Sequence, residues 1–308
     1  SMSAPENSTP STSIILVTYN GWSHTQTCLD ALLSQALPPG FEIIVVDNAS
    51  SDDTPARIRA AFPSVKVIES GGNVGFGAGC NIGLREAQGE FCLLLNNDAV
   101  MLPEQIASLL EAYARLGLNG IYTARIVDNE GVEEASCFRD VKPGALLVDI
   151  FMLMSAATRR HTYTLTENES EAMDIAACSG ALCLFPRDLF VKTGGFDEKF
   201  FMYFEDMDLC RRARALGYGV YANSLVTVRH ACGGSTHDNI QRAKTIDNSQ
   251  RIFYRKHYGT LGIACTRIHQ FARSAPRALV HGLMGWNERQ RNLCKMHASL
   301  AADALLQA

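Results

Sequence analysis

Short apolar runs alternate with helix-like segments along the first 120 residues. Continuous apolar runs predict buried parallel strands at 13–18, 41–46, 65–68 and 91–95. Apolar residues at helical spacing, with Pro stops, predict helices at 25–35, 54–61, a stretch ending near 87, and 103–116. This alternation predicts an α/β fold with a mainly parallel central sheet flanked by helices.

The pattern after residue 120 is less regular. It predicts a strand and hairpin at 121–143, a partly helical and partly mobile insertion at 144–172, strands at 176–185 and 220–230, and a helix at 204–217. From 239 onward the chain is predominantly helical. We therefore expect a disordered N-terminus at 1–12, a domain at 13–259 with halves 13–120 and 121–259, and a helical tail at 260–308.

Composition narrows the class of protein. A hydrophobic share of 47% supports a sizeable core, and a net charge of −4 excludes a nucleic-acid-binding signature. The ten cysteines are scattered without a C-x-x-C pair, which favours a reduced, cytoplasmic protein. No apolar run reaches the roughly 18–20 residues of a membrane helix, and residues 1–12 do not resemble a signal peptide. Ser1-Met2 is interpreted as the remainder of an expression tag.

Polar residues follow three of the predicted strands, at the sheet edge where α/β proteins bind ligands. They are Thr18-Tyr19-Asn20, Asp47-Asn48 and Asn96-Asn97-Asp98. Asp47 either contacts a nucleotide or caps the helix that follows. The Asn96–Asp98 triplet offers oxygen ligands for a divalent cation, although a simple Asx turn has the same composition.

Glycines are dense between Gly71 and Gly83, where a backbone can approach a phosphate or sugar closely. Cys80 occupies the place of the third glycine in G-x-G-x-x-G, so a Rossmann oxidoreductase is disfavoured. A nucleotidyltransferase is also disfavoured, because no Lys or Arg follows the first strand.

Residues 200–212 place acidic residues directly after an aromatic segment. Glu205 and Asp206 fall in the first turn of a helix, where negative charge suits the helix dipole. Apolar surroundings would also raise a carboxylate pKa and favour a general base. Asp208 is spaced for ion pairs with the arginines that follow, which indicates a structural role. His230 ends a strand and is either structural or a ligand.

Four segments together resemble glycosyltransferase family 2, which has the GT-A fold. They are SIILVTYN at 13–20, VVDNASSDDT at 45–54, LLNND at 94–98, and GGFD at 194–197 with EDMDLCR at 205–211. The resemblance covers about residues 13–260. It implies a nucleotide-binding half at 13–120, an acceptor-binding half at 121–259 and a helical C-terminal extension.

The resemblance also implies roles for individual residues. Asp98 would hold Mg²⁺ or Mn²⁺, His230 would complete the metal site, and Asp206 would be the catalytic base. Asn96 stands where the motif usually has its first Asp, which leaves fewer charged ligands. The implied donor-binding residues are Thr18, Tyr19, Asn20, Asp47, Asn73, Gly75, Asn81 and Asn97. The implied acceptor-binding or supporting residues are Glu205, Phe204 and Arg211.

The segment NVGFGAGCNIG at 73–83 is similar to the bacterial rhamnosyltransferase subgroup. This similarity implies an inverting enzyme that moves rhamnose from dTDP-L-rhamnose to a glycan or lipid-linked glycan in surface polysaccharide synthesis. A UDP-sugar donor, or a non-catalytic module that binds sugar nucleotides or glycans, remains an alternative.

The tail from 260 onward combines basic and apolar residues. A basic amphipathic helix can lie on an anionic membrane surface, here the inner face of the cytoplasmic membrane. Packing on the domain or on a second copy in a homodimer is the other interpretation.

Overall fold

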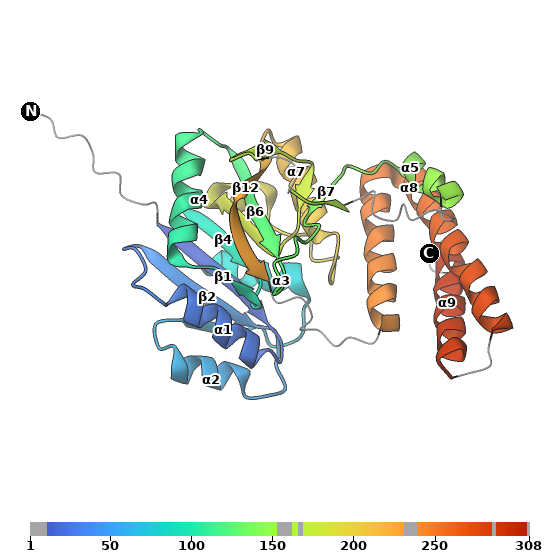
Figure 1. Ribbon diagram of the computed structural model, residues 1–308, viewed down its shortest axis with the longest axis horizontal. Coiled ribbons are helices and arrows are strands. Elements are labelled where there is room, and N and C mark those ends of the chain that lie inside the picture. Colours follow the sequence, from blue (N-terminus) through green and yellow to red (C-terminus); the bar gives the residue numbers. More distant parts are fainter. Residues whose placement is uncertain (1–10, 153–161, 166–168, 231–238, 285–287, 307–308) are drawn as a thin grey trace, which may run out of the picture. The chain divides into compact units, whose positions relative to one another are not determined.

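The computed structural model describes residues 11–152, 162–165, 169–230, 239–284 and 288–306. The chain divides into two compact units. The α/β unit comprises Ser1–Phe138, Thr162–Glu198 and Asp206–Ser235, and the helical unit comprises Arg139–His161, Lys199–Glu205 and Thr236–Ala308. The chain therefore enters and leaves the helical unit twice before it ends there (Figure 1).

A nine-stranded sheet, counted over the described residues, forms the centre of the α/β unit. Its order is β3-β2-β1-β4-β11-β6-β12-β5, with β9 paired to β12. Strands β3, β2, β1 and β4 are mutually parallel, whereas β11 is antiparallel to β4 and β6. The strands are β1 (Thr12–Thr18), β2 (Phe41–Asp47), β3 (Lys66–Glu69), β4 (Phe91–Leu95), β5 (Ala99–Val100), β6 (Gly120–Val127), β9 (Met173–Asp174), β11 (Leu182–Pro186) and β12 (Gly219–His230). A small second sheet joins β10 (Ala177–Cys178), β7 (Cys137–Phe138) and β8 (Thr162–Tyr163).

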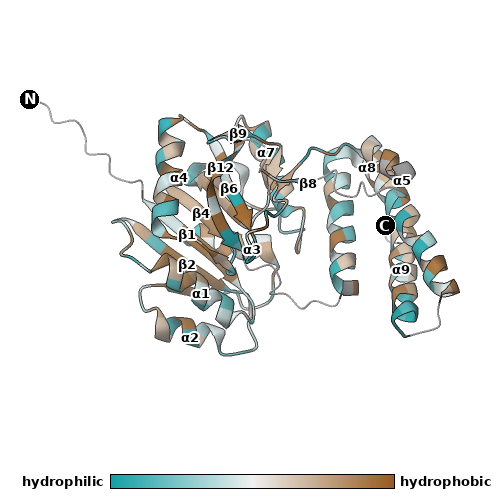
Figure 2. Ribbon diagram, in the orientation of Figure 1, coloured by the Kyte–Doolittle hydropathy of each residue, from teal (hydrophilic) through white to brown (hydrophobic). Residues whose placement is uncertain are grey.

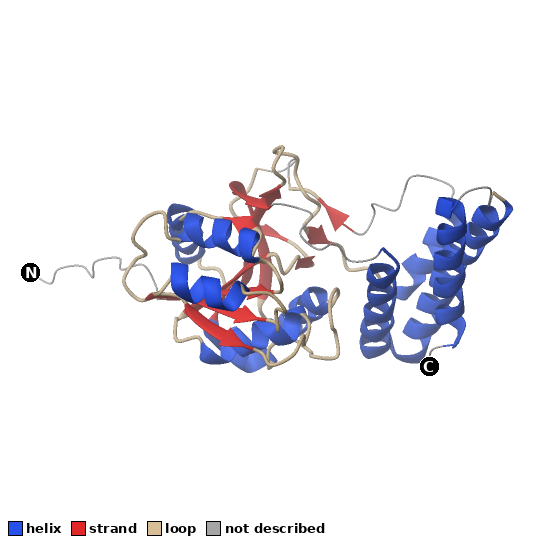
Figure 3. Ribbon diagram, turned by 90° about the horizontal axis from the view of Figure 1, so that it is seen from below, coloured by secondary structure: helices blue, strands red, loops and turns tan. Residues whose placement is uncertain are grey.

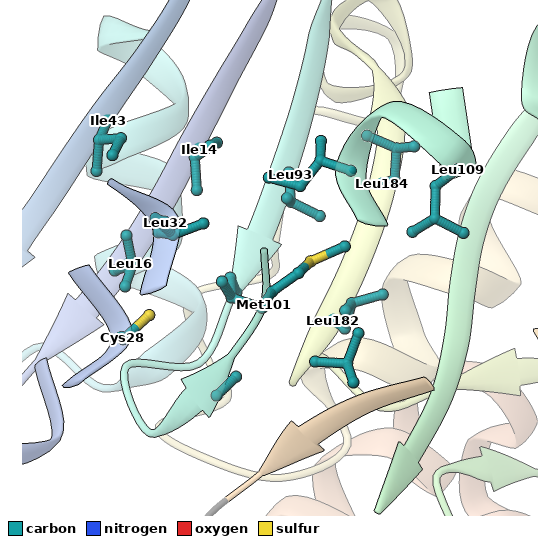
Figure 4. Close-up of a cluster of buried hydrophobic side chains, with 14 of the residues drawn as sticks. Ile14, Leu16, Cys28, Leu32, Ile43, Leu93, Met101, Leu109, Leu182 and Leu184 are labelled. Carbon is teal, nitrogen blue, oxygen red and sulfur yellow. The ribbon is translucent and has the colours of Figure 1, made fainter. Parts of the chain in front are cut away.

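Alternate residues of each central strand point to opposite faces of the sheet, so two cores form. Ile14 and Leu16 of β1 pack with α1 (Trp22–Leu32) and α4 (Pro103–Arg115) on one face, shown in Figure 4. Ile15 packs on the other face with α3 (Phe76–Glu86) and α7 (Glu205–Ala215). Hydrophobic positions accordingly line the central strands in Figure 2. The remaining helices of this unit are α2 (Thr54–Ala61) and α6 (Arg187–Thr193).

Glycines allow α3 to lie close to the sheet. A methyl group on Gly83 would lie 2.6 Å from Cγ2 of Ile15, and one on Gly79 would lie 3.0 Å from Cγ1 of Val17. Both glycines are buried within the helix. Part of the glycine-rich segment therefore serves helix–sheet packing rather than ligand contact.

The helical unit contains α5 (Pro143–Met152), α8 (Asn239–Leu283) and α9 (Glu288–Leu306). Figure 3 colours all helices of the chain blue and all strands red. Helix α8 is interrupted at Gly259, whose φ of 62° is left-handed. Across this kink, Arg251 Nη1 donates to Gln270 Oε1 at 2.8 Å, and Arg273 Nη2 contacts Asp247 Oδ1 at 2.5 Å. These polar contacts join the two halves of α8. Among the described residues, no helix is both long and apolar enough to cross a bilayer.

The predicted α/β class and the principal strands are confirmed, with differences at the edges of elements. Helix α1 begins at Trp22 rather than near residue 25, and β1 begins at Thr12. The single strand predicted at 176–185 is wrong, because a turn at Ser179–Ala181 separates β10 from β11. Of the insertion predicted at 144–172, α5 is helical, and residues 153–161 and 166–168 lie outside the described residues.

Candidate active site

The turn between β4 and β5 carries Asn96, Asn97 and Asp98 at the carboxyl end of β4. Strand β5 pairs antiparallel with the end of β12, which sets Ala99 opposite His230. This pairing brings Nε2 of His230 to 2.8 Å from Oδ1 of Asp98. Nδ2 of Asn96 lies 3.2 Å from the same ring nitrogen. The structure thus brings together all three residues that sequence reasoning assigned to a metal.

Glu134 is the acidic partner of His230 that the sequence did not reveal. Its Oε1 lies 3.0 Å from Nδ1 of His230, on the far side of the ring from Asp98. The hairpin that follows β6 places it there, since Glu134 N donates to Ile126 O. Burial would lower the pKa of His230, but the two carboxylates outweigh this effect and raise the pKa to about 9. No local sequence pattern marks Glu134, because the contact spans 96 positions.

The donor set at this turn fits a divalent cation that shares its shell with a diphosphate. Oδ1 of Asp98 is buried from solvent. Nε2 of His230 lies close to this oxygen, but Asp98 Oδ1 accepts no hydrogen bond of good geometry. Burial would raise the pKa of Asp98, yet the contact with His230 outweighs it and the pKa lies below its ordinary value. Within the described residues, no group of three or more His, Cys, Asp or Glu side chains has metal-ligand geometry. A cation at this turn would be held by Asp98 and His230, with phosphate oxygens in the rest of its shell.

Asp206 lies in the first turn of α7 and accepts two backbone hydrogen bonds. Gly180 N donates to its Oδ2 at 3.0 Å, and Met207 N donates to its Oδ1 at 2.8 Å. Burial raises the pKa of Asp206, and these backbone donors partly offset the rise. The neighbouring Ala181 O accepts a hydrogen bond from Asn96 N at 2.9 Å, so one turn connects Asp206 to the β4–β5 turn.

The aromatic segment that precedes Asp206 has an unusual backbone. Tyr203 and Phe204 both have left-handed φ values, of 70° and 67°. Such conformations cost on the order of 1–3 kcal/mol each and are retained where surrounding contacts impose them. Within the helical unit, the Phe204 ring packs against Phe253 with centroids 5.6 Å apart, and Ser249 Oγ donates to Met202 O at 2.7 Å. The first half of α8 therefore holds this segment.

Three of the residues predicted to bind the donor, Thr18, Asn20 and Asn97, follow strands at the same edge of the sheet and make hydrogen bonds there. Thr18 is buried, and its hydroxyl contacts Thr25 Oγ1 at 2.9 Å and accepts a bond from Asn97 Nδ2 at 3.2 Å. Tyr19 is exposed. Oδ1 of Asn20 accepts bonds from the backbone of Ser51 and Asp52, which ties the loops after β1 and β2 together.

Asp47 has a local structural role in addition to any contact with a nucleotide. Its buried carboxylate accepts bonds from the backbone N of Ser50 at 3.0 Å and from the Ser50 hydroxyl at 2.6 Å. It does not cap α2 itself, because Asp52 Oδ1 accepts from Thr54 N. The capping interpretation of Asp47 is therefore wrong, and Asp47 shapes the loop before the helix.

Asn48, which the sequence placed in a polar cluster with Asp47 but to which it assigned no role, organises the glycine-rich loop. Its Nδ2 donates to Asn73 Oδ1 and to Gly75 O, each at 3.1 Å, and its Oδ1 accepts from Val74 N. Gly75 has a φ of 90°, which favours glycine at this position before α3. The sequence could not assign this role, because the contacts of Asn48 join segments about 25 positions apart.

Asn81 and the acidic helix end have internal partners. The buried amide of Asn81 donates to Phe196 O and Glu198 Oε1 and accepts from Phe196 N, so it positions the loop at 195–198. Glu205 is buried, and Arg211 is half-buried on α7. The predicted pairing of Asp208 with Arg212 is confirmed at 2.7 Å.

The chain has the GT-A fold, which it shares with solved structures that resemble it. The mannosyltransferase PcManGT from Pyrobaculum calidifontis, in complex with GDP-Man and Mn²⁺, superimposes with a TM-score of 0.59 at 20% identity, over 98% of this chain and 89% of that one. TarS 1–349 from S. aureus with UDP-GlcNAc gives a TM-score of 0.55 at 15% identity, over 96% and 81%.

Residues 13–194 match the family model described as glycosyl transferase family 2, and the chain belongs to this family. Two curated relatives carry more specific names. An N-acetylglucosaminyl-diphospho-decaprenol L-rhamnosyltransferase from Mycobacterium tuberculosis is 27% identical over 78% of this chain and 82% of the relative. The rhamnosyltransferase WbbL from Escherichia coli is 27% identical over 73% and 84%.

Proposed function

We propose that this chain is an inverting glycosyltransferase that moves L-rhamnose from dTDP-L-rhamnose to a lipid-linked glycan. The observation that carries the inverting chemistry is the single carboxylate of Asp206, which is held by two backbone donors and connected to the β4–β5 turn. An inverting displacement needs one base near the acceptor, unlike the paired carboxylates of glycosidases.

In this proposal, Asp98 and His230 hold Mg²⁺ or Mn²⁺, and Glu134 fixes the orientation of the His230 ring. When bound, the cation neutralises charge that develops on the leaving diphosphate. Asp206 accepts the proton of the acceptor hydroxyl while the oxygen attacks the anomeric carbon. The bond from that carbon to the diphosphate breaks on the opposite side, so the configuration inverts.

The donor sugar rests on the two relatives named as rhamnosyltransferases, each aligned over more than two thirds of both chains. The acceptor rests on the decaprenol-linked glycan in the name of the mycobacterial relative. Such an acceptor would place the reaction at the cytoplasmic membrane. Donor contact belongs to the linked residues at the carboxyl edge of β1, β2 and β4.

A donor panel tests the proposal: dTDP-L-rhamnose, dTDP-glucose, UDP-glucose, UDP-GlcNAc and GDP-mannose, each with Mn²⁺ or with EDTA. A ligand that binds the folded state raises its melting temperature, so we expect a Mn²⁺-dependent increase with dTDP-L-rhamnose. An increase in melting temperature with a UDP-sugar alone would show that the donor is that UDP-sugar and not dTDP-L-rhamnose. A donor that binds without transfer to a polyprenyl-diphosphate-linked GlcNAc acceptor would favour the non-catalytic module.

A further inference from the structure

In the second half of α8, the exposed side is apolar and the buried side is polar, which is the reverse of an ordinary surface helix. Between residues 261 and 284, the exposed positions are all apolar or glycine. The most exposed are Leu261, Ile268, Leu279 and Leu283, and the last two have 65% and 75% of their surface exposed. All the charged side chains of this stretch are less exposed. A surface helix of a water-soluble domain normally shows the opposite arrangement.

The buried side of the same helix is polar and already engaged within the helical unit. Thr266 and Gln270 are fully buried. Gln270 Nε2 donates to Asp247 O at 2.9 Å, and Arg273 pairs with Asp247. On a neighbouring side, His281 contacts Gln290 of α9 at 2.5 Å. The outer face is thus the part of α8 that these contacts leave uncovered.

The outer apolar residues form one continuous stripe. Leu261, Ile268, Leu279 and Leu283 are separated by 7, 11 and 4 positions, and each of these intervals returns to the same side of an α-helix. At 1.5 Å per residue, the stripe is about 33 Å long. We name it the α8 outer stripe.

We propose that the α8 outer stripe lies on an anionic membrane surface. Apolar side chains on one face of a helix, accompanied by basic residues, are the features of an interfacial helix. Residues 260–308 hold six Arg and Lys against two acidic residues, and Arg289, Arg291 and Lys295 are exposed on α9. This proposal concerns a surface distinct from the β4–β5 turn and does not depend on the identity of the donor.

A second copy of the chain fits this surface less well. A single helix face about 33 Å long and roughly 10 Å wide covers about 330 Å², well below the roughly 800 Å² that each partner buries in a stable interface. The excess of basic residues would also bring like charges together across a symmetric contact. A surface of anionic lipid requires no minimum interface area and attracts basic side chains.

Flotation of the full-length protein with vesicles provides the test. The vesicles contain phosphatidylcholine alone or with about 30% phosphatidylglycerol, and they carry neither donor nor glycan acceptor, so the outcome is independent of sugar transfer. We expect binding to the anionic vesicles, and a decrease of at least about tenfold in the partition coefficient for L279Q/L283Q. The charge variant R289Q/R291Q should also bind more weakly.

The matched control is V191Q/L225Q, which removes two exposed apolar side chains of the α/β unit. It should bind like the parent, and circular dichroism should show parent-like helix content in every variant. Flotation that is absent for the parent, or unchanged in L279Q/L283Q, would overturn the proposal. So would a dimer that L279Q/L283Q dissociates, detected by light scattering, in a protein that does not float.

Discussion

Asp206 experiences two influences of opposite sign on its pKa. Burial favours the neutral acid, whereas the N–H groups of Gly180 and Met207 favour the carboxylate. The net pKa lies above the ordinary value of 3.8. A base tuned in this way is closer to the operating pH and accepts a proton more readily than an ordinary surface aspartate.

For Asp206→Asn, we expect the turnover number to fall at least about 10²-fold, because the proton acceptor is lost, while donor affinity stays close to that of the parent. The base acts only when unprotonated. Activity of the parent should therefore decline as the pH falls through the raised pKa, with a midpoint above 3.8. Initial rates and donor titration across pH provide the measurement. Asp188→Asn, at an exposed aspartate of α6, is the control and should keep parental rates; equal loss in both variants would remove Asp206 from the base role.

Glu134→Gln should weaken Mn²⁺ binding about 10- to 100-fold, the usual effect of losing a charged partner behind a metal-bound histidine. Glutamine can still accept from His230 Nδ1 but carries no charge, so Glu134→Ala should weaken binding more. Titration calorimetry with Mn²⁺ and dTDP measures the effect without turnover. Glu130→Gln changes an exposed acid of the same hairpin and should bind as the parent does. Unchanged affinity in both Glu134 variants would show that Glu134 does not support the metal site.

At the scale of elements, the sequence predicted the strands that have a local hydrophobic pattern. It did not predict the strand that forms only by pairing with a segment distant in the sequence. The buried strands β1, β2 and β4 are continuous apolar runs and were predicted almost to the residue. Strand β5 has two residues and exists because β12 pairs with it, so no local pattern marks it. That pairing creates the Asp98–His230 contact, which explains why the residues were predictable as candidates while their geometry was not.

Gly83→Ala tests the packing of α3 on the sheet. The new methyl group would meet Ile15 Cγ2 at 2.6 Å and Val46 Cγ2 at 3.2 Å. We expect the free energy of unfolding to fall by about 1–3 kcal/mol, the usual cost of overpacking. Urea denaturation provides the measurement. Gly144→Ala in α5 has no atom within 4 Å and should be neutral or slightly stabilising; the same response at both sites would indicate that crowding at Gly83 does not matter.

At the scale of the whole molecule, the cysteines are part of the cores. All nine cysteines in the described ranges are free, and eight of them are buried. Burial raises the pKa of Cys92 and that of Cys137 to about 12, so their thiols stay protonated and unreactive at neutral pH. The eight buried thiols therefore pack as small apolar groups in the protein interior.

Thiol titration should reflect this burial. We expect the native protein to react rapidly with Ellman's reagent at no more than two cysteines, Cys294 and Cys232, the latter lying outside the described residues. All ten should react in guanidinium chloride. Pre-treatment with a reductant should leave the number of reactive thiols unchanged, because no disulfide is expected. Rapid reaction of more than two native thiols would mean that the cores open readily on the timescale of labelling.

The left-handed pair Tyr203–Phe204 has a consequence for how this protein can be divided. The pair belongs to the helical unit, and the α/β unit resumes at Asp206, the proposed base. Removing the C-terminal helices would delete Phe253 and Ser249, the side chains that hold the strained segment. The helices are therefore not a detachable appendage. A chimaera that exchanges the helical unit between relatives would have to transplant residues 139–161, 199–205 and 236–308 together, because these three stretches belong to one compact unit.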